Sequence, residues 1–182
     1  MPSPHRTAVI GLGSMGYGMA MSCLAAGHTT FGYDIATAPM NRFRADGGSD
    51  GALGDVAPSL DAVIVVVLNA AQTETVLFGK AGVVPLMKPG AVVMACPTVP
   101  PDFARDMEAR CAAHDVHYLD APISGGSIKA ARGALSVMAA GIPAAFAAAR
   151  PVLDATAETV FELGDQAGPG SAMKAVNQLL AG

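Results

Sequence analysis

The stretch Gly11-Leu12-Gly13-Ser14-Met15-Gly16 decides the fold, because it joins a predicted strand to a predicted helix. The strand is predicted over residues 7–11, and the helix that follows places Met15, Met19 and Cys23 on one face. In a G-x-G-x-x-G turn the first glycine permits a tight turn, the second lets the backbone approach a pyrophosphate, and the third packs the helix on the strand. All six residues are therefore predicted to bind the phosphates of a dinucleotide at the helix N-terminus.

An acidic residue follows the second predicted strand, which spans residues 29–33. This residue, Asp34, lies eighteen positions beyond Gly16, where a carboxylate can hydrogen-bond the adenosine ribose hydroxyls. Its charge would repel a 2′-phosphate, so NAD is predicted as the cofactor and NADP is disfavoured. A structural glycine turn in an unrelated α/β protein is the alternative.

Beyond Asp34, short apolar runs alternate with segments of helical period, which is typical of a parallel sheet covered by helices on both faces. The run at 62–68 is continuous and β-branched, so it is predicted as a central strand. Further strands are predicted at 91–95, 117–119, 134–139 and 159–163, and helices at 101–113, at 143–155 and from about residue 171 onward. The predicted fold class is α/β, with a doubly wound, mostly parallel Rossmann-type sheet.

No linker or repeat divides these segments. The prediction is an NAD-binding Rossmann domain over residues 1–165 and the start of a long interdomain helix over 166–182. The last four residues form an apolar end without a helix stop signal, so we expect the protein to continue beyond them.

Composition excludes several classes of protein. Hydrophobic residues make up 52% of the 182 residues and no run is long enough for a membrane span of about 20 residues, so no membrane partner is expected. The net charge of −4 without a basic cluster argues against nucleic acid. Only 14% of residues are charged, against roughly a quarter in ordinary soluble proteins, so we expect a domain or partner subunit to cover part of the surface.

The three cysteines indicate a reducing environment. Cys23, Cys96 and Cys111 are odd in number and fall within apolar patterns, which favours buried thiols and a cytoplasmic location. No metal site is predicted, because Cys111, His114 and His117 straddle the predicted end of a helix and start of a strand.

The sequence GLGSMGYGMA at residues 11–20 resembles the β-hydroxyacid dehydrogenase family, which includes 3-hydroxyisobutyrate, tartronate semialdehyde and L-threonate dehydrogenases. Residues 120–126, DAPISGG, resemble the substrate-binding segment of that family. Residues 168–174, GPGSAMK, resemble its catalytic-lysine segment. The resemblance covers the whole chain and is finest with the L-threonate dehydrogenase branch. It implies a further all-helical domain, absent here, and a homo-oligomer when the protein is full length.

Lys174 is the general acid/base that the resemblance implies. Oxidation of a hydroxyl by hydride transfer requires removal of the hydroxyl proton, and a desolvated lysine with a lowered pKa can accept it near neutral pH. An exposed lysine early in a helix is the alternative.

Substrate contacts are predicted on both sides of this lysine. Ser124, Gly125 and Gly126 supply a hydroxyl and unobstructed N–H groups that can hold a carboxylate, although an ordinary Ser-Gly-Gly loop would have the same sequence. Asn177 and Gln178 share the helical face of Lys174. The family usually has asparagine where this chain has Gln178, so a hydrogen-bonded core amide is the alternative there.

Three weaker cofactor contacts follow the strands. Thr98 matches a family segment beside the nicotinamide ribose, and Leu68 and Asn69 stand at the end of the central strand, where ligands bind in such sheets. A helix N-cap is the alternative for either of the latter two.

The sequence therefore predicts an oxidoreductase that transfers hydride between NAD and a small hydroxy acid, with L-threonate or a related sugar acid as the first choice of substrate. 3-Hydroxyisobutyrate dehydrogenase and tartronate semialdehyde reductase are alternatives. A non-catalytic NAD-binding module is an alternative of another class.

Overall fold

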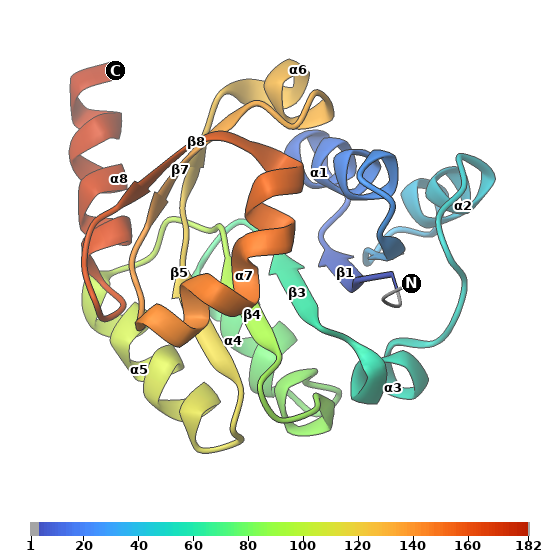
Figure 1. Cartoon of the computed structure of the whole chain (residues 1–182), viewed down its shortest axis with the longest axis horizontal. Coiled ribbons are helices and arrows are strands. Elements are labelled where there is room, and N and C mark those ends of the chain that lie inside the picture. Colours follow the sequence, from blue (N-terminus) through green and yellow to red (C-terminus); the bar gives the residue numbers. More distant parts are fainter. Residues whose placement is uncertain (1–3, 182) are drawn as a thin grey trace.

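A parallel five-stranded sheet forms the centre of the computed structural model, which describes residues 4–181 (Figure 1). Its strands are β1 (Arg6–Ile10), β2 (Thr29–Tyr33), β3 (Ala62–Val65), β4 (Val92–Ala95) and β5 (His117–Asp120). Their order is β2-β1-β3-β4-β5, and Ser49 adds a single parallel bridge to Phe31 outside β2. With that one residue counted as a strand, the order is that of the Rossmann fold, with its switch point between β1 and β3.

Helices cover both faces of this sheet. They are α1 (Ser14–Ala25), α2 (Thr37–Ala45), α3 (Leu53–Val56), α4 (Ala70–Phe78), α5 (Pro101–Ala112), α6 (Gly126–Ala131), α7 (Pro143–Thr156) and α8 (Pro169–Ala181), with short 3-10 turns η1 (Ala57–Ser59) and η2 (Val84–Leu86). Alternate strand residues enter two cores. In β3, Val63 and Val65 pack with α4 and α5, whereas Ala62 and Ile64 pack with α1 and α7. Figure 1 shows α7 in front of the sheet and α4 behind it.

A second sheet extends the first beyond β5. It contains β6 (Ile123–Ser124), β7 (Leu135–Ala139) and β8 (Ala157–Glu162), with β6 antiparallel and β8 parallel to β7. A bridge between Asp120 and Ala140 joins the two sheets, and α8 packs against β5, β7 and α5. In the part of the chain that the structure describes, no helix has both the length and the apolar character needed to cross a membrane.

The doubly wound, mostly parallel architecture is confirmed, with local corrections. β1 ends at Ile10, because Gly11 leaves the strand with a φ of +99°. The central strand β3 ends at Val65, since the chain then turns toward α4, and the last helix begins at Pro169 rather than near residue 171. Proline is well suited to the first turn of a helix. The strands predicted at 134–139 and 159–163 form in the second sheet.

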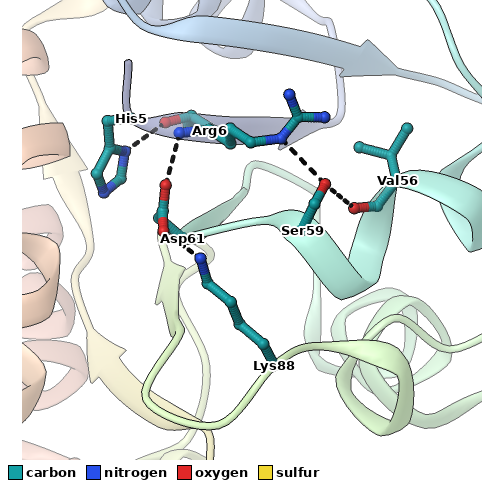
Figure 2. A network of polar contacts seen from close by, with 7 residues as sticks. His5, Arg6, Val56, Ser59, Asp61 and Lys88 are labelled. Atoms are coloured by element: carbon teal, nitrogen blue, oxygen red, sulfur yellow. Dashed lines mark hydrogen bonds and ion pairs between the residues drawn. The ribbon is translucent and has the colours of Figure 1, made fainter. Parts of the chain in front are cut away.

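Polar contacts tie the amino-terminal edge of the main sheet, as Figure 2 shows. The Asp61 carboxylate accepts the Arg6 N–H at 2.8 Å and pairs with the Lys88 ammonium at 2.5 Å. The Thr7 hydroxyl lies 3.0 Å from His5 Nδ1 and 3.1 Å from His28 Nδ1. This network, His5-Thr7-His28 with Asp61 and Lys88, lies at the edge opposite to the carboxyl ends of the strands.

Candidate dinucleotide and substrate site

The carboxyl ends of the parallel strands meet at one edge of the sheet. Ile10, Val65, Ala95 and Asp120 stand in register across β1, β3, β4 and β5. The loops that follow them therefore emerge side by side, next to the switch point between β1 and β3. Ligands of open α/β sheets bind in the crevice at this edge.

The three glycines of the first turn have different surroundings. A Cβ on Gly11 would lie 2.1 Å from the Val66 carbonyl oxygen, and one on Gly16 would lie 1.8 Å from the Gly11 carbonyl oxygen. These two positions tolerate only hydrogen, because backbone atoms occupy the space. A Cβ on Gly13 would meet nothing within 4 Å. The second glycine therefore leaves open space in front of the helix N-terminus.

The N-terminus of α1 has free donors. Gly13 is its N-cap and offers no side chain, and the first turn carries no acidic residue. Ser14 is exposed and Met15 is half-buried. Unpaired N–H groups and the helix dipole attract anions at such an end, so the backbone here fits a pyrophosphate.

Asp34 is held by the same turn. Its Oδ2 accepts the Leu12 N–H at 2.7 Å, and its Oδ1 accepts the Ala36 N–H at 2.9 Å. The carboxylate is half-buried, and each of its oxygens keeps a lone pair for a further donor such as a ribose hydroxyl. Phosphate donors and ribose acceptors thus occupy one rigid turn, and this arrangement fits a dinucleotide.

Residues after β3 cap the next helix. The Asn69 side chain accepts the Gln72 N–H at 2.9 Å as N-cap of α4, so the helix-cap alternative applies to Asn69. Gln72 in turn accepts the Leu68 N–H at 2.9 Å, and Leu68 is 86% exposed. Gln72 was missed in the sequence, although a cap residue followed three positions later by Gln is a known signal.

Thr98 follows β4 and is half-buried. Because β3 and β4 are neighbours in register, Thr98 leaves the sheet at the same edge as Leu68. Its contact with the nicotinamide ribose stays a prediction.

The predicted carboxylate-binding residues lie at the second sheet. Ser124 pairs with Ser136 of β7, Gly125 has a φ of +137°, and Gly126 begins α6 with a φ of +75°. Both glycines are exposed, and a Cβ on Gly126 would meet nothing within 4 Å. The loop therefore presents its backbone to solvent.

Lys174 lies on α8 and is half-buried. A Cβ on Gly170, one turn earlier, would lie 2.5 Å from the Met138 carbonyl oxygen, so this face of α8 packs against β7, the strand that pairs with β6. Asn177 and Gln178 are exposed farther along the helix in the described chain, and their substrate contacts stay predictions. Ser124 lies on β6, which pairs with β7, and Lys174 lies on α8, which packs against β7; the described chain has no hydrogen bond between the two side chains.

Asp120 is a buried polar residue that sequence reasoning did not select as a site residue. It is 1% exposed at the end of β5, and its carboxylate accepts hydrogen bonds from Gly168 and Ser171 at the start of α8. Nearby, the Glu108 carboxylate accepts the Ala167 N–H at 3.1 Å. Burial raises the pKa of Glu108; the Ala167 N–H lowers it, and the charges of Asp120 and Asp165 raise it.

Comparisons with known proteins agree with this geometry. Residues 6–164 match the protein family described as the NAD binding domain of 6-phosphogluconate dehydrogenase. L-threonate dehydrogenase from Pectobacterium atrosepticum is 45% identical over 182 residues, which cover 99% of this chain and 60% of that protein. NAD-dependent L-serine dehydrogenase from Pseudomonas aeruginosa is 33% identical over 175 residues, which cover 96% of this chain and 59% of that protein.

A solved structure of 3-hydroxyisobutyrate dehydrogenase from Salmonella typhimurium is similar, with a TM-score of 0.93 and 43% identity over 97% of this chain and 62% of that one. The chain thus spans about 60% of the length of the curated relatives it matches. The resemblance to β-hydroxyacid dehydrogenases, including the L-threonate dehydrogenase branch, is confirmed by these relatives. By the match over residues 6–164, the chain belongs to the family of NAD-binding domains described for 6-phosphogluconate dehydrogenase.

Proposed function

We propose that this chain is the cofactor-binding part of an NAD-dependent dehydrogenase that transfers hydride between NAD and the hydroxyl carbon of a small hydroxy acid. The observation that carries the proposal is the turn at Gly11–Gly16, where free N–H groups of α1 and the fixed carboxylate of Asp34 lie together. The confirmed resemblance to the β-hydroxyacid dehydrogenases supports the reaction class.

The residues divide the work by their chemistry. NAD, when bound, supplies the carbon that accepts hydride. The glycine turn binds the phosphates, and Asp34 accepts hydrogen bonds from the adenosine ribose. Leu68 and Thr98 contact the remainder of the cofactor at the ends of the strands. Ser124, Gly125 and Gly126 bind the substrate carboxylate, and Asn177 and Gln178 contact the substrate from α8. Lys174 takes the proton from the hydroxyl oxygen as hydride leaves the carbon that bears this hydroxyl, and it returns a proton to the oxygen in the reverse reduction.

L-threonate, or a related four-carbon sugar acid, is the proposed substrate. Five relatives named L-threonate dehydrogenase are 43–45% identical over 96–99% of this chain. 3-Hydroxyisobutyrate or tartronate semialdehyde is the alternative, and the similar Salmonella typhimurium structure supports the former.

The test is NAD reduction by the intact protein with L-threonate, 3-hydroxyisobutyrate and L-serine, and NADH oxidation with tartronate semialdehyde. We expect the highest kcat/KM with L-threonate, and a fall in kcat of about 10²- to 10⁴-fold in Lys174→Ala because a general acid/base is lost. Saturating NAD binding by calorimetry, without turnover of any of these acids, would instead support the non-catalytic module.

Three further features of the protein are proposed with this function. The buried, unpaired Cys23, Cys96 and Cys111 support a cytoplasmic location, which cell fractionation can test. α8 exposes Val176, Leu179 and Leu180 at 51%, 84% and 84%, which supports a homo-oligomer of the intact protein. The same exposed residues support the proposal that residues 166–182 start an interdomain helix; within that range α8 spans Pro169–Ala181, and residue 182 lies outside the described residues. Light scattering of the intact protein tests the oligomer.

A further inference from the structure

A buried carboxylate starts the helix that carries Lys174. Asp120 is 1% exposed, and its Oδ2 accepts the N–H groups of Gly168 and Ser171, each at 2.9 Å. Its Oδ1 accepts the Ser171 hydroxyl at 2.6 Å. All three donors are neutral, so the charge is stabilised by oriented N–H and O–H groups and by the positive end of the α8 dipole.

Asp120 also joins three parts of the fold through its backbone. Its N–H donates to the Ala140 carbonyl at 3.0 Å, and its carbonyl accepts the Ala140 N–H at 2.8 Å, which ties β5 to the end of β7. A Cβ on Gly170 would lie 2.8 Å from the Asp120 carbonyl oxygen. The first turn of α8 is therefore pressed against this junction and has little room to shift.

The two predicted halves of the substrate site both extend from this junction. Ser124 lies four residues after Asp120, and the intervening Pro122 carbonyl accepts the Met138 N–H at 2.9 Å, which pins that segment to β7. Lys174 lies three residues after Ser171 on α8. A movement of the start of α8 would displace Lys174 while the Ser124 segment stayed in place.

We propose that Asp120 is a positioning residue for proton transfer: its carboxylate fixes the first turn of α8 and so sets the position of Lys174 relative to the carboxylate-binding loop at Ser124. This inference rests on the proposed function. A displacement of about 1 Å between reacting groups can lower a rate on the order of 10²-fold, so the contact matters for rate more than for binding.

The test compares two identical changes in the intact protein. Asp120→Asn keeps the shape of the side chain but replaces one acceptor oxygen with an NH₂ group, which faces N–H or O–H donors of Gly168 and Ser171. Asp61→Asn makes the same change at the opposite edge of the sheet, where the carboxylate also accepts a backbone N–H. We expect both to lower Tm. Only Asp120→Asn should lower kcat, by about 10- to 100-fold, with the Kd for NAD changed by less than about threefold because the glycine turn and Asp34 are not altered.

Ser171→Ala is the milder variant and decides the matter if Asp120→Asn does not fold. It removes only the 2.6 Å hydroxyl contact and should lower kcat by about three- to tenfold. Lys174→Ala is measured beside it. Loss of activity in Lys174→Ala with an unchanged kcat in Asp120→Asn, or in Ser171→Ala where the former is unfolded, overturns the positioning role alone. An unchanged rate in Lys174→Ala overturns the lysine chemistry, and the positioning role with it.

Discussion

Gly13 and Gly16 stand three residues apart in the same turn but are constrained by different things. A Cβ at Gly16 would penetrate the Gly11 carbonyl, so we expect Gly16→Ala to reduce the free energy of unfolding by about 1–3 kcal/mol. Gly13→Ala meets no atom and should change stability by less than about 0.5 kcal/mol.

The same pair separates packing from cofactor binding. Gly13→Ala places a methyl group where the phosphates are proposed to approach, so NAD affinity should fall about tenfold or more. Urea unfolding and calorimetry on both variants check this. Full NAD affinity in Gly13→Ala would show that the phosphates do not lie against this backbone.

Asp34 governs the choice of cofactor in the proposed site. Asp34→Ala removes the acceptor for the ribose hydroxyls and frees the Leu12 N–H, so the Kd for NAD should rise about 10- to 100-fold. The preference for NAD over NADP should narrow, because the charge that repels a 2′-phosphate is gone. Asp50→Ala is the control, since that exposed carboxylate pairs with Arg44. An equal loss in both variants would rule out a specific role for Asp34.

Sequence reasoning reached residues whose partners are local and missed those whose partners are distant. Gly11, Gly16 and Asp34 follow from spacing, because a strand, a turn and a helix fix their relation. Asp120 gives no such signal, since its partner Ser171 is 51 positions away and its burial depends on how β5, β7 and α8 assemble.

At the scale of an element, the N-cap of α4 carries a measurable share of stability. Asn69→Ala removes the acceptor for the Gln72 N–H and should destabilise the protein by about 1 kcal/mol. Thr75→Ala, on the exposed face of the same helix, should change it by less than about 0.5 kcal/mol. Chemical denaturation checks both, and equal losses would contradict the capping role.

A helix could be predicted from the sequence where its residues mark both its ends and the face that it buries. α5 was predicted to within one residue at its C-terminus, because Pro101 and Asp102 mark its start and Ala104, Met107 and Cys111 form its buried stripe. α2 and α4 were not predicted. α2 buries only Phe43 and α4 only Thr73 and Leu77, so neither has a full apolar stripe.

At the scale of the whole molecule, stability depends on pH through two histidines: His5, which Figure 2 shows, and His28, whose ring also contacts the Thr7 hydroxyl. The pKa values of His5 and His28 are both lowered from 6.5, mainly because the rings are partly buried. The charge of Lys88 lowers the pKa of His5 further, and His5 lowers the pKa of His28. The Asp61 charge opposes these effects at both rings. Because the folded imidazoles resist protonation, the unfolded chain takes up protons first as pH falls below 6.5. The contribution of these histidines to the free energy of unfolding should therefore be complete above pH 6.5 and should be lost as the pH falls through their lowered pKa values.

Urea titrations at pH 7.5 and 5.5 measure this decrease. Replacement of both histidines by glutamine should flatten the dependence in this range. Asp61 responds separately. Burial raises its pKa, but the hydrogen bonds from Arg6 and Lys88 and the positive charges of Lys88 and His5 lower it overall. Its contribution to stability is therefore complete above pH 3.8 and is lost as the pH falls through the lowered pKa. If the free energy of unfolding of the double variant falls as much between pH 7.5 and 5.5 as that of the unaltered protein, other groups cause the pH dependence.

The architecture was predictable because a parallel sheet buried on both faces leaves a simple pattern of β-branched runs between helices. The boundary between two sheets was not. β6 has only two residues, and in the described chain one bridge, from Asp120 to Ala140, joins the two sheets; it forms only after distant segments have met.

Ser49 provides the only bridge to the outer side of β2 within the described chain. Because β2 is the edge strand of the main sheet, its outer row of backbone N–H and C=O groups is a template for edge-to-edge pairing between molecules. The Ser49 N–H donates to the Thr30 carbonyl at 2.8 Å, so the loop covers part of that row. The loop at Ser49 thus shields part of the edge of β2, and loss of this bridge would be expected to reduce solubility at high concentration.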